Sequence, residues 1–314
     1  MKTFAALSLA LVSTASAQPH TARQVTADDY AVQTLNNIET GFKVNDANLP
    51  KLNVTKEWQG ICIQNLNYAE QVAFFKTGTI TRQNILGAKA YYIAHVETSS
   101  VNPGPGTEKS KMTISSSTTT SQVDTKGWTV GVKLTGTVGK EGVASGLVEL
   151  SGTYSDTTTK TDSTTKTVTR EEWCEVGYEC RIETWTFHMD IHAKPRVNGN
   201  YQLWSVANQY GEEIPTCSMP KNLRSCEQFT QRFNEWCTEE KLEGGAVHIP
   251  AKFDEVHIKV PVYEANGYQT FTRIVKVFHP ITKSARAEAA EPVIGTKETV
   301  LEAMKQGTKF QFLD

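Results

Sequence analysis

The sequence predicts an all-β protein with long, twisted antiparallel strands and a small disulfide-tied region. No proline occurs between Gly106 and Lys194, as extended pairing requires, because proline cannot donate to a strand ladder. Ser and Thr supply eight of the nine residues 113–121 and ten of the fifteen residues 155–169, which predicts strands with little apolar surface. Between these segments apolar and polar residues alternate around a turn at Gly139–Gly142. The 314 residues suffice for one elongated unit or for two ordinary domains.

Residues 1–17 have the features of a secretory signal peptide. Lys2 supplies the positive start, Phe4–Val12 is a short apolar run, and Ala15–Ala17 is a cleavage site of the A-x-A type. A membrane anchor would need about 18–20 apolar residues, so we expect a secreted, extracellular protein. The formal net charge of −2 and the absence of a dense Lys/Arg cluster argue against a nucleic-acid partner.

Residues 18–108 are predicted to form an N-terminal β-rich region and a candidate receptor-binding part. The segment 18–50 is polar and weakly patterned, and a cleaved pro-segment is one interpretation of it. Asn53 begins the sequon Asn-Val-Thr and is a candidate glycosylation site on the surface. Short strands are expected at 61–63, 72–75 and 90–96. Six aromatic residues of this region form either a core or a ligand-binding face: Trp58, Tyr68, Phe74, Phe75, Tyr91 and Tyr92.

Six cysteines in a secreted chain predict three disulfides. Cys174 and Cys180 are expected to pair across a short loop, and the order of pairing among the other four is open. Zinc is disfavoured because no C-x2-C pair occurs. The predicted disulfide residues are Cys62, Cys174, Cys180, Cys217, Cys226 and Cys237.

The central segment is predicted to be one long hairpin with its turn centred on Glu141. The loop is then Lys140-Glu141-Gly142, and Gly142 takes the left-handed position that glycine adopts without strain. The turn as a whole comprises Gly139, Lys140, Glu141 and Gly142.

This register gives the hairpin two different faces. One face carries no charge from Trp128 to Tyr154, whereas on the other face Lys133 lies opposite Glu149. A shift of one residue would place Val132 opposite Glu149 and destroy this pattern. The two strands of 11 residues, Trp128–Val138 and Ala144–Tyr154, are long enough to cross a bilayer when tilted. Because a lone hairpin leaves backbone groups unpaired in lipid, several copies would have to close a ring.

Two other interpretations of this region remain open. Ser/Thr runs occur in O-glycosylated stalks, although those are usually rich in proline and lack amphipathic alternation. An ordinary β-sandwich with one polar face would also alternate.

The C-terminal half contains further strands and one candidate metal site. Residues 180–193 alternate strictly, and the polar face includes His188, Asp190 and His192, which could hold a metal but are more simply a solvated face. Strands are also expected at 256–260 and 271–278, and residues 281–314 form a tail that is a candidate activation peptide. No G-x-S-x-G motif or paired carboxylates indicate an enzyme, and we expect neither a cofactor nor a resident metal.

The amphipathic segment between two Ser/Thr strands, from Lys126-Gly-Trp-Thr-Val-Gly-Val-Lys133 to Gly146-Leu-Val-Glu-Leu-Ser-Gly-Thr-Tyr154, resembles the aerolysin-type β-pore-forming proteins, the epsilon-toxin and mosquitocidal-toxin relatives. The resemblance covers roughly residues 109–193 and implies an elongated, aerolysin-like molecule. It also implies a pore-forming module at 109–280 whose hairpin 126–156 inserts into the target membrane. Each subunit of a ring oligomer would contribute one such hairpin to a transmembrane barrel. The lipid-facing residues would be Trp128, Val130, Val132, Leu134, Val138, Val143, Val148, Leu150 and Tyr154, and Lys133 and Glu149 would face the lumen.

The sequence therefore favours a secreted, non-enzymatic, toxin-like protein that binds a cell surface through an unknown glycan or protein receptor, oligomerises and forms a pore. The main alternative is a non-lytic secreted binding protein, lectin-like or effector-like, on the same β scaffold. A secreted hydrolase without sequence motifs is the third hypothesis, and it requires a pocket with convergent titratable groups.

Overall fold

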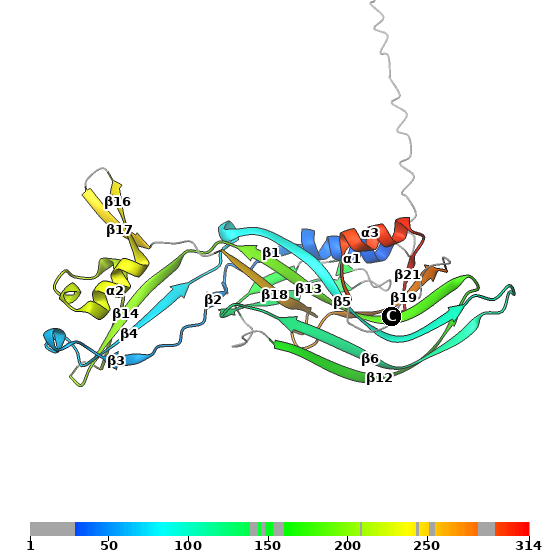
Figure 1. The fold of residues 1–314 in the computed structure, drawn as a ribbon, viewed down its shortest axis with the longest axis horizontal. Coiled ribbons are helices and arrows are strands. Elements are labelled where there is room, and N and C mark those ends of the chain that lie inside the picture. Colours follow the sequence, from blue (N-terminus) through cyan, green and yellow to red (C-terminus); the bar gives the residue numbers. More distant parts are fainter. Residues whose placement is uncertain are drawn as a thin grey trace, which may run out of the picture.

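The computed structural model describes residues 29–138, 144–145, 148–152, 160–207, 209–242, 245–250, 255–281 and 293–313. The protein is elongated and mostly composed of strands, as predicted, with a long body and a small lobe at one end (Figure 1). Residues 1–17, predicted to be a signal peptide, lie outside the described residues.

The body is built around the central strand β13, Tyr178–Ala193. One edge of β13 pairs antiparallel with β5 along its whole length, and the other edge pairs with β19 and then with β18. The apolar side chains of β13 alternate, and all of Trp185, Phe187, Met189 and Ile191 are buried in the main core. The sheet also includes β5 (Ile85–Asn102), β18 (Val256–Tyr263), β19 (Thr272–Pro280), β20 (Val293–Thr296) and β21 (Lys309–Phe312). Beyond β18 it continues through β8 (Gly131–Leu134), β11 (Val148–Ser151) and β1 (Phe42–Val44).

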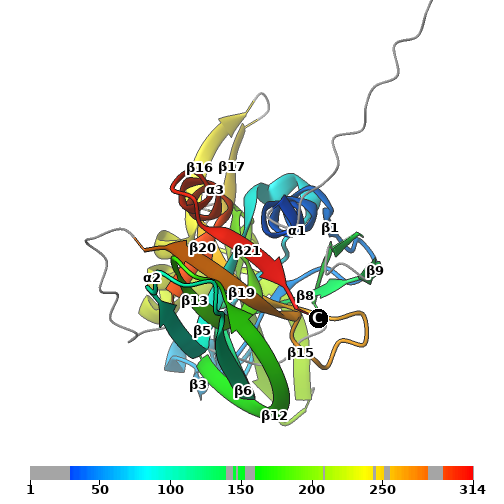
Figure 2. The ribbon, with the colours of Figure 1, turned by 90° about the vertical axis from the view of Figure 1, so that its right-hand side faces the viewer.

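The two Ser/Thr segments form a separate ribbon. Strands β6 (Ser110–Val123) and β12 (Lys160–Cys174) pair antiparallel, with an irregularity between Thr167 and Arg170. This ribbon lies on the side of the body opposite the helices α1 (Asp29–Thr40) and α3 (Lys297–Lys305) (Figure 2). The chain leaves the ribbon through Lys126 and Gly127, which both have positive φ, so the predicted single long hairpin is instead two separate ladders.

The polar face of β13 is covered by β6 rather than solvated. Thr184, Thr186 and His188 are fully buried, so the expectation of a solvated polar face was wrong for these three residues. The hydroxyls of Ser117 and Thr184 are 3.0 Å apart, and the Thr120 N–H donates to Thr186 Oγ1 at 3.2 Å. A strand rich in Ser and Thr can satisfy buried polar groups on a neighbouring strand, which an apolar strand cannot do.

The small lobe is a four-stranded sheet packed against α2, Glu227–Trp236. Two disulfides tie it together, Cys62–Cys226 and Cys217–Cys237, while Cys174–Cys180 lies in the body. All six cysteines are thus paired, as predicted, including Cys174 with Cys180. The strands of the lobe are β3 (Trp58–Gly60), β4 (Gln71–Gly78), β14 (Val197–Ser205) and β15 (Gln209–Pro215), followed by the separate pair β16 (Cys237–Leu242) and β17 (Gly245–Pro250). Short 3-10 turns are η1 (Ile63–Asn65), η2 (Arg82–Asn84), η3 (Thr216–Ser218) and η4 (Leu223–Ser225).

The lobe combines segments that are distant in the sequence. The predicted N-terminal region, residues 18–108, divides between the two parts, because β3 and β4 join the small lobe and β5 joins the body.

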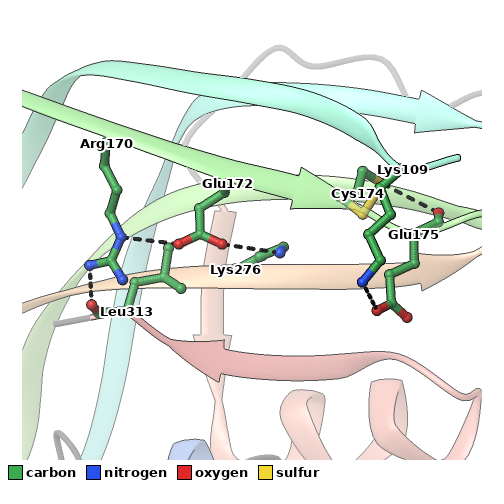
Figure 3. Close-up of polar contacts among 8 residues, drawn as sticks. Lys109, Arg170, Glu172, Cys174, Glu175, Lys276 and Leu313 are labelled. Atoms are coloured by element: carbon green, nitrogen blue, oxygen red, sulfur yellow. Dashed lines mark hydrogen bonds and ion pairs between the residues drawn. A yellow bond between two sulfur atoms is a disulfide. The ribbon is translucent and has the colours of Figure 1, made fainter.

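The C-terminal tail is integrated into the body. It pairs β20 with β5 and β21 with β19, and between them runs α3, Lys297–Lys305, capped by Thr296. Figure 3 shows how β12 holds the end of this tail: Arg170 Nη1 donates to the carbonyl of Leu313, and Arg170 Nε donates to Glu172 at 3.1 Å. Glu172 also pairs at 3.2 Å with the buried ammonium group of Lys276, which joins β12 to β19.

Candidate membrane-insertion site

The hairpin predicted from the sequence has the predicted register where the structure describes it. Strand β8 (Gly131–Leu134) pairs antiparallel with β11 (Val148–Ser151), so that Val132 lies opposite Leu150 and Lys133 lies opposite Glu149. Nearer the turn, β9 (Thr137–Val138) pairs with β10 (Ala144–Ser145) in the same register. The alternation of side chains and the turn position are therefore sufficient to fix the pairing.

The apolar face of the hairpin is buried inside the body. Its side chains are at most 4% exposed and belong to the main core, together with residues of α1 and β13. A face that resembles a lipid-facing surface in the sequence is thus a core surface in this state of the protein. The buried side chains of this face are Trp128, Val130, Val132, Leu134, Val148 and Leu150.

The opposite face is polar and partly exposed. Lys133 Nζ and Glu149 Oε1 form an ion pair at 3.9 Å, and both side chains are about one third exposed. The closer partner of Glu149 is Asn45, whose Nδ2 donates to the carboxylate at 2.9 Å. A pair so exposed contributes less than about 1 kcal/mol to stability, so the amide contact matters more for holding the hairpin.

An N-terminal strap, which we define as residues 41–53, runs along the hairpin. Its strand β1 (Phe42–Val44) pairs parallel with β11, and its strand β2 (Lys51–Leu52) pairs antiparallel with β7 (Trp128–Thr129). The strap is preceded by α1 (Asp29–Thr40), whose apolar side chains join the same core.

Backbone contacts fix the strap along both strands of the hairpin. The Asn45 N–H donates to the Leu150 carbonyl at 2.8 Å, and the Gly152 N–H donates to the Asn48 carbonyl at 2.8 Å. A Cβ atom at Gly152 would lie 2.6 Å from the Leu49 carbonyl oxygen, so only glycine permits this close approach. The free edge of β8 is closed as well, because Val132 lies opposite Val262 of the parallel strand β18. The part of the hairpin formed by β8 and β11 therefore has both of its edges paired.

Sequence analysis did not find the strap. Its only signal is the three-residue alternation Phe42-Lys-Val44, which is too short to identify a partner. Other predicted residues of the hairpin, Val143, Tyr154 and the turn Gly139, Lys140, Glu141 and Gly142, lie outside the described residues. Val138 is paired in β9 opposite Ala144.

Asn53, the predicted glycosylation site, lies at the end of the strap. Its side chain is exposed, and its N–H donates to the Gly127 carbonyl at 2.7 Å. Glycosylation at this position remains a prediction.

The candidate metal residues of β13 are separated by burial. His188 is fully buried, with Nδ1 donating to the Thr186 carbonyl and Nε2 accepting from the Gln122 N–H at 3.0 Å. Burial lowers the pKa of His188 to about 4, so the ring is neutral at physiological pH. His192 instead contacts Glu255 at 3.0 Å. Across the described part of the chain, no three His, Cys, Asp or Glu side chains are grouped to hold a metal.

None of the described helices has both the length and the apolar character needed to cross a bilayer.

The fold and the site together define an elongated, mostly β protein in which an N-terminal strap pairs with an amphipathic hairpin. Comparison with known proteins found no matching family model and no matching curated protein. Solved structures do align with this chain, at low similarity. The Cry23Aa1 and Cry37Aa1 binary protein complex aligns with 9% identity over 76% of this chain and 87% of that chain, at a TM-score of 0.21. Parasporin-2, a Bacillus thuringiensis toxin that recognizes cancer cells, aligns with 13% identity over 76% and 96%, at a TM-score of 0.19.

The Mpp75Aa1.1 β-pore-forming protein from Brevibacillus laterosporus aligns with 10% identity over 76% of this chain and 86% of that chain, at a TM-score of 0.16. Because all three TM-scores are below 0.5, the proposals below rest on the strands and contacts of this chain.

Proposed function

We propose that this protein is a secreted, non-enzymatic pore-forming protein that binds a cell surface, oligomerises and inserts the hairpin 126–156 to form a transmembrane β-barrel. The observation that carries the proposal is the fixed register of β8 and β11, with every described apolar side chain on one face and Lys133 and Glu149 on the other. Strands with such alternation suit the wall of a barrel, where one face meets lipid and the other meets water.

The remaining parts take supporting roles in this proposal. The small lobe, to which residues 18–108 contribute β3 and β4, is the candidate receptor-binding part, and residues 109–280 supply the pore-forming module. The tail from residue 281 is a candidate activation peptide, because β20 and β21 occupy edges of β5 and β19 that subunits of an oligomer could otherwise use.

Leakage of a trapped dye from vesicles and from red cells tests the proposal directly. The mature protein, with and without limited protease treatment, is expected to release dye and to form an SDS-resistant oligomer on the membrane. Charged substitutions at Val132 or Leu150 are unsuitable tests, because both side chains are completely buried in the closed state and a charge there would unfold the protein. Protein that binds membranes without leakage or oligomers in either form would overturn the proposal.

A non-lytic secreted binding protein is the second candidate function. It is favoured by the burial of the apolar face and by the pairing of both hairpin edges, which make the hairpin an ordinary part of the core. This candidate predicts a stable monomer that binds a glycan or protein and never releases dye.

A further inference from the structure

Two loops lie at the end of the small lobe away from the body (Figure 1), and several of their apolar side chains are exposed. The first loop is residues 61–69, and the second is residues 203–211 around the junction of β14 and β15, of which the structure describes all except Asn208. The two loops are adjacent, since the Glu70 N–H donates to the Trp204 carbonyl at 2.9 Å and the rings of Trp58 and Tyr210 are 5.5 Å apart. We call these two loops the lobe tip.

The lobe tip is unusual in both hydrophobicity and charge. Neither loop contains a charged residue, although 21% of the chain is charged and about four would be expected in eighteen residues. Five large apolar side chains of the tip are between 51% and 84% exposed: Ile63, Leu66, Tyr68, Val206 and Tyr210. Apolar side chains concentrated in this way on a soluble surface mark a site of interaction.

The first loop is held in place before any partner arrives. Cys62 is joined to Cys226 by a disulfide, and the Cys62 N–H donates to Gln228 Oε1 at 2.8 Å. Asn65 is buried and donates through Nδ2 to the Leu223 carbonyl at 3.3 Å. The exposed side chains therefore project from a rigid support, and little conformational entropy is lost when they bind.

We propose that the lobe tip docks on an electrically neutral lipid surface and makes the first contact of the protein with its target membrane. Ile63 and Val206 are the most exposed members of the tip, and aliphatic side chains gain free energy in hydrocarbon but have no polar group with which to recognise a sugar. Tyr68 and Tyr210 fit the boundary between hydrocarbon and head groups, where amphipathic rings accumulate.

The charges around the tip fit a neutral surface better than an anionic one. Glu70 and Glu212 flank the two loops. Asn222 donates a hydrogen bond to the Tyr68 hydroxyl, and the residue before it, Lys221, is the nearest cation in sequence to this contact. Without a Lys/Arg cluster the tip gains nothing from anionic lipid, so its binding is expected to resist salt. This inference rests on the proposed function for its biological setting, but its test does not depend on pore formation.

Flotation with vesicles of pure phosphatidylcholine tests the docking. The double variant Ile63→Ser/Val206→Ser is expected to bind about 100-fold more weakly than the unchanged protein, at about tenfold for each aliphatic side chain removed from lipid. The matched control is Leu86→Ser/Val101→Ser, which removes from the body two side chains that are also more than half exposed and should bind normally. Both double variants change only exposed positions, so their melting temperatures should match that of the unchanged protein.

Three outcomes would overturn the docking. In the first, the tip variant floats as well as the unchanged protein. In the second, the unchanged protein requires a glycolipid or a membrane protein in the vesicles. In the third, binding requires anionic lipid and disappears in about 0.5 M salt, which screens surface charges. Flotation without dye leakage would instead contradict the pore-forming function and support the docking.

Discussion

A disulfide between the N-terminal strap and the hairpin is expected to prevent pore formation. Lys51 lies opposite Thr129 in the antiparallel pair of β2 and β7, so the double variant Lys51→Cys/Thr129→Cys can join the two segments across neighbouring strands. A hairpin that must reach a membrane cannot remain attached to the strap. The oxidised variant should therefore leak dye at least about 100-fold more slowly, a change equivalent to about 3 kcal/mol, and a reducing agent should restore leakage.

The structure sets the size of the barrier that the strap helps to create. At least seven hydrogen bonds join strap and hairpin, four between backbones and three involving side chains. At about 0.5–1.5 kcal/mol each, they contribute about 4–10 kcal/mol. Exposing the six buried apolar side chains to water would cost about 9–18 kcal/mol more, which is comparable to the whole stability of a domain. For the proposed pore to form, the hairpin would therefore have to pass directly from the core to lipid without being released into water.

A second disulfide provides the control. Lys133→Cys/Glu149→Cys joins β8 to β11, which stay paired in both the closed protein and the proposed barrel. Its oxidised and reduced forms should therefore leak equally, since both lack the bond between Asn45 and Glu149. Equal leakage by the oxidised and reduced forms of Lys51→Cys/Thr129→Cys, with the crosslink verified by mass spectrometry, would refute the reasoning that the strap must separate. The reduction must leave the native disulfides intact. The reducing agent is therefore titrated to the lowest concentration that opens the engineered pair, and an unchanged melting temperature shows that the native disulfides remain.

Two predictions concern the stability of the body. Glu172→Gln leaves the buried ammonium group of Lys276 without its anionic partner and should lower the free energy of unfolding by about 3 kcal/mol. Glu171→Gln removes only an exposed ion pair and should lower it by less than about 1 kcal/mol. Urea titration of both variants checks this, and equal losses would contradict it. Because the pKa of His188 is about 4 in the fold and about 6.5 when unfolded, the unfolded chain binds the extra proton first, so stability should fall by about 3 kcal/mol as pH drops from 6.5 to 4. Protonation of His188 at Nε2 would remove the hydrogen bond from the Gln122 N–H. His188→Gln should therefore flatten this part of the pH profile of stability. An unchanged profile in the variant would show that His188 is not its cause.

Much of the hairpin could be predicted from the sequence because its information is local. Side chains alternate with a period of two, and a Gly-flanked turn sets the register, so Lys133 opposite Glu149 follows without knowledge of any other segment. The pairing of Cys174 with Cys180 is local in the same way, since the two cysteines are six positions apart. Pairing between distant residues could not be predicted in this way. Cys62 and Cys226 are 164 positions apart, and nothing in the sequence selects that pair.

The sequence by itself determined that residues 128–151 form a two-faced hairpin with a charge-free side. Only the tertiary structure decided what covers that side, because burial depends on which distant segments pack against a strand. Asn45 reaches Glu149 across 104 positions, and β1 joins β11 through three residues that have no recognisable pattern of their own. The same reason explains His188, whose alternation placed it on a polar face, while the covering strand β6 removed that face from water.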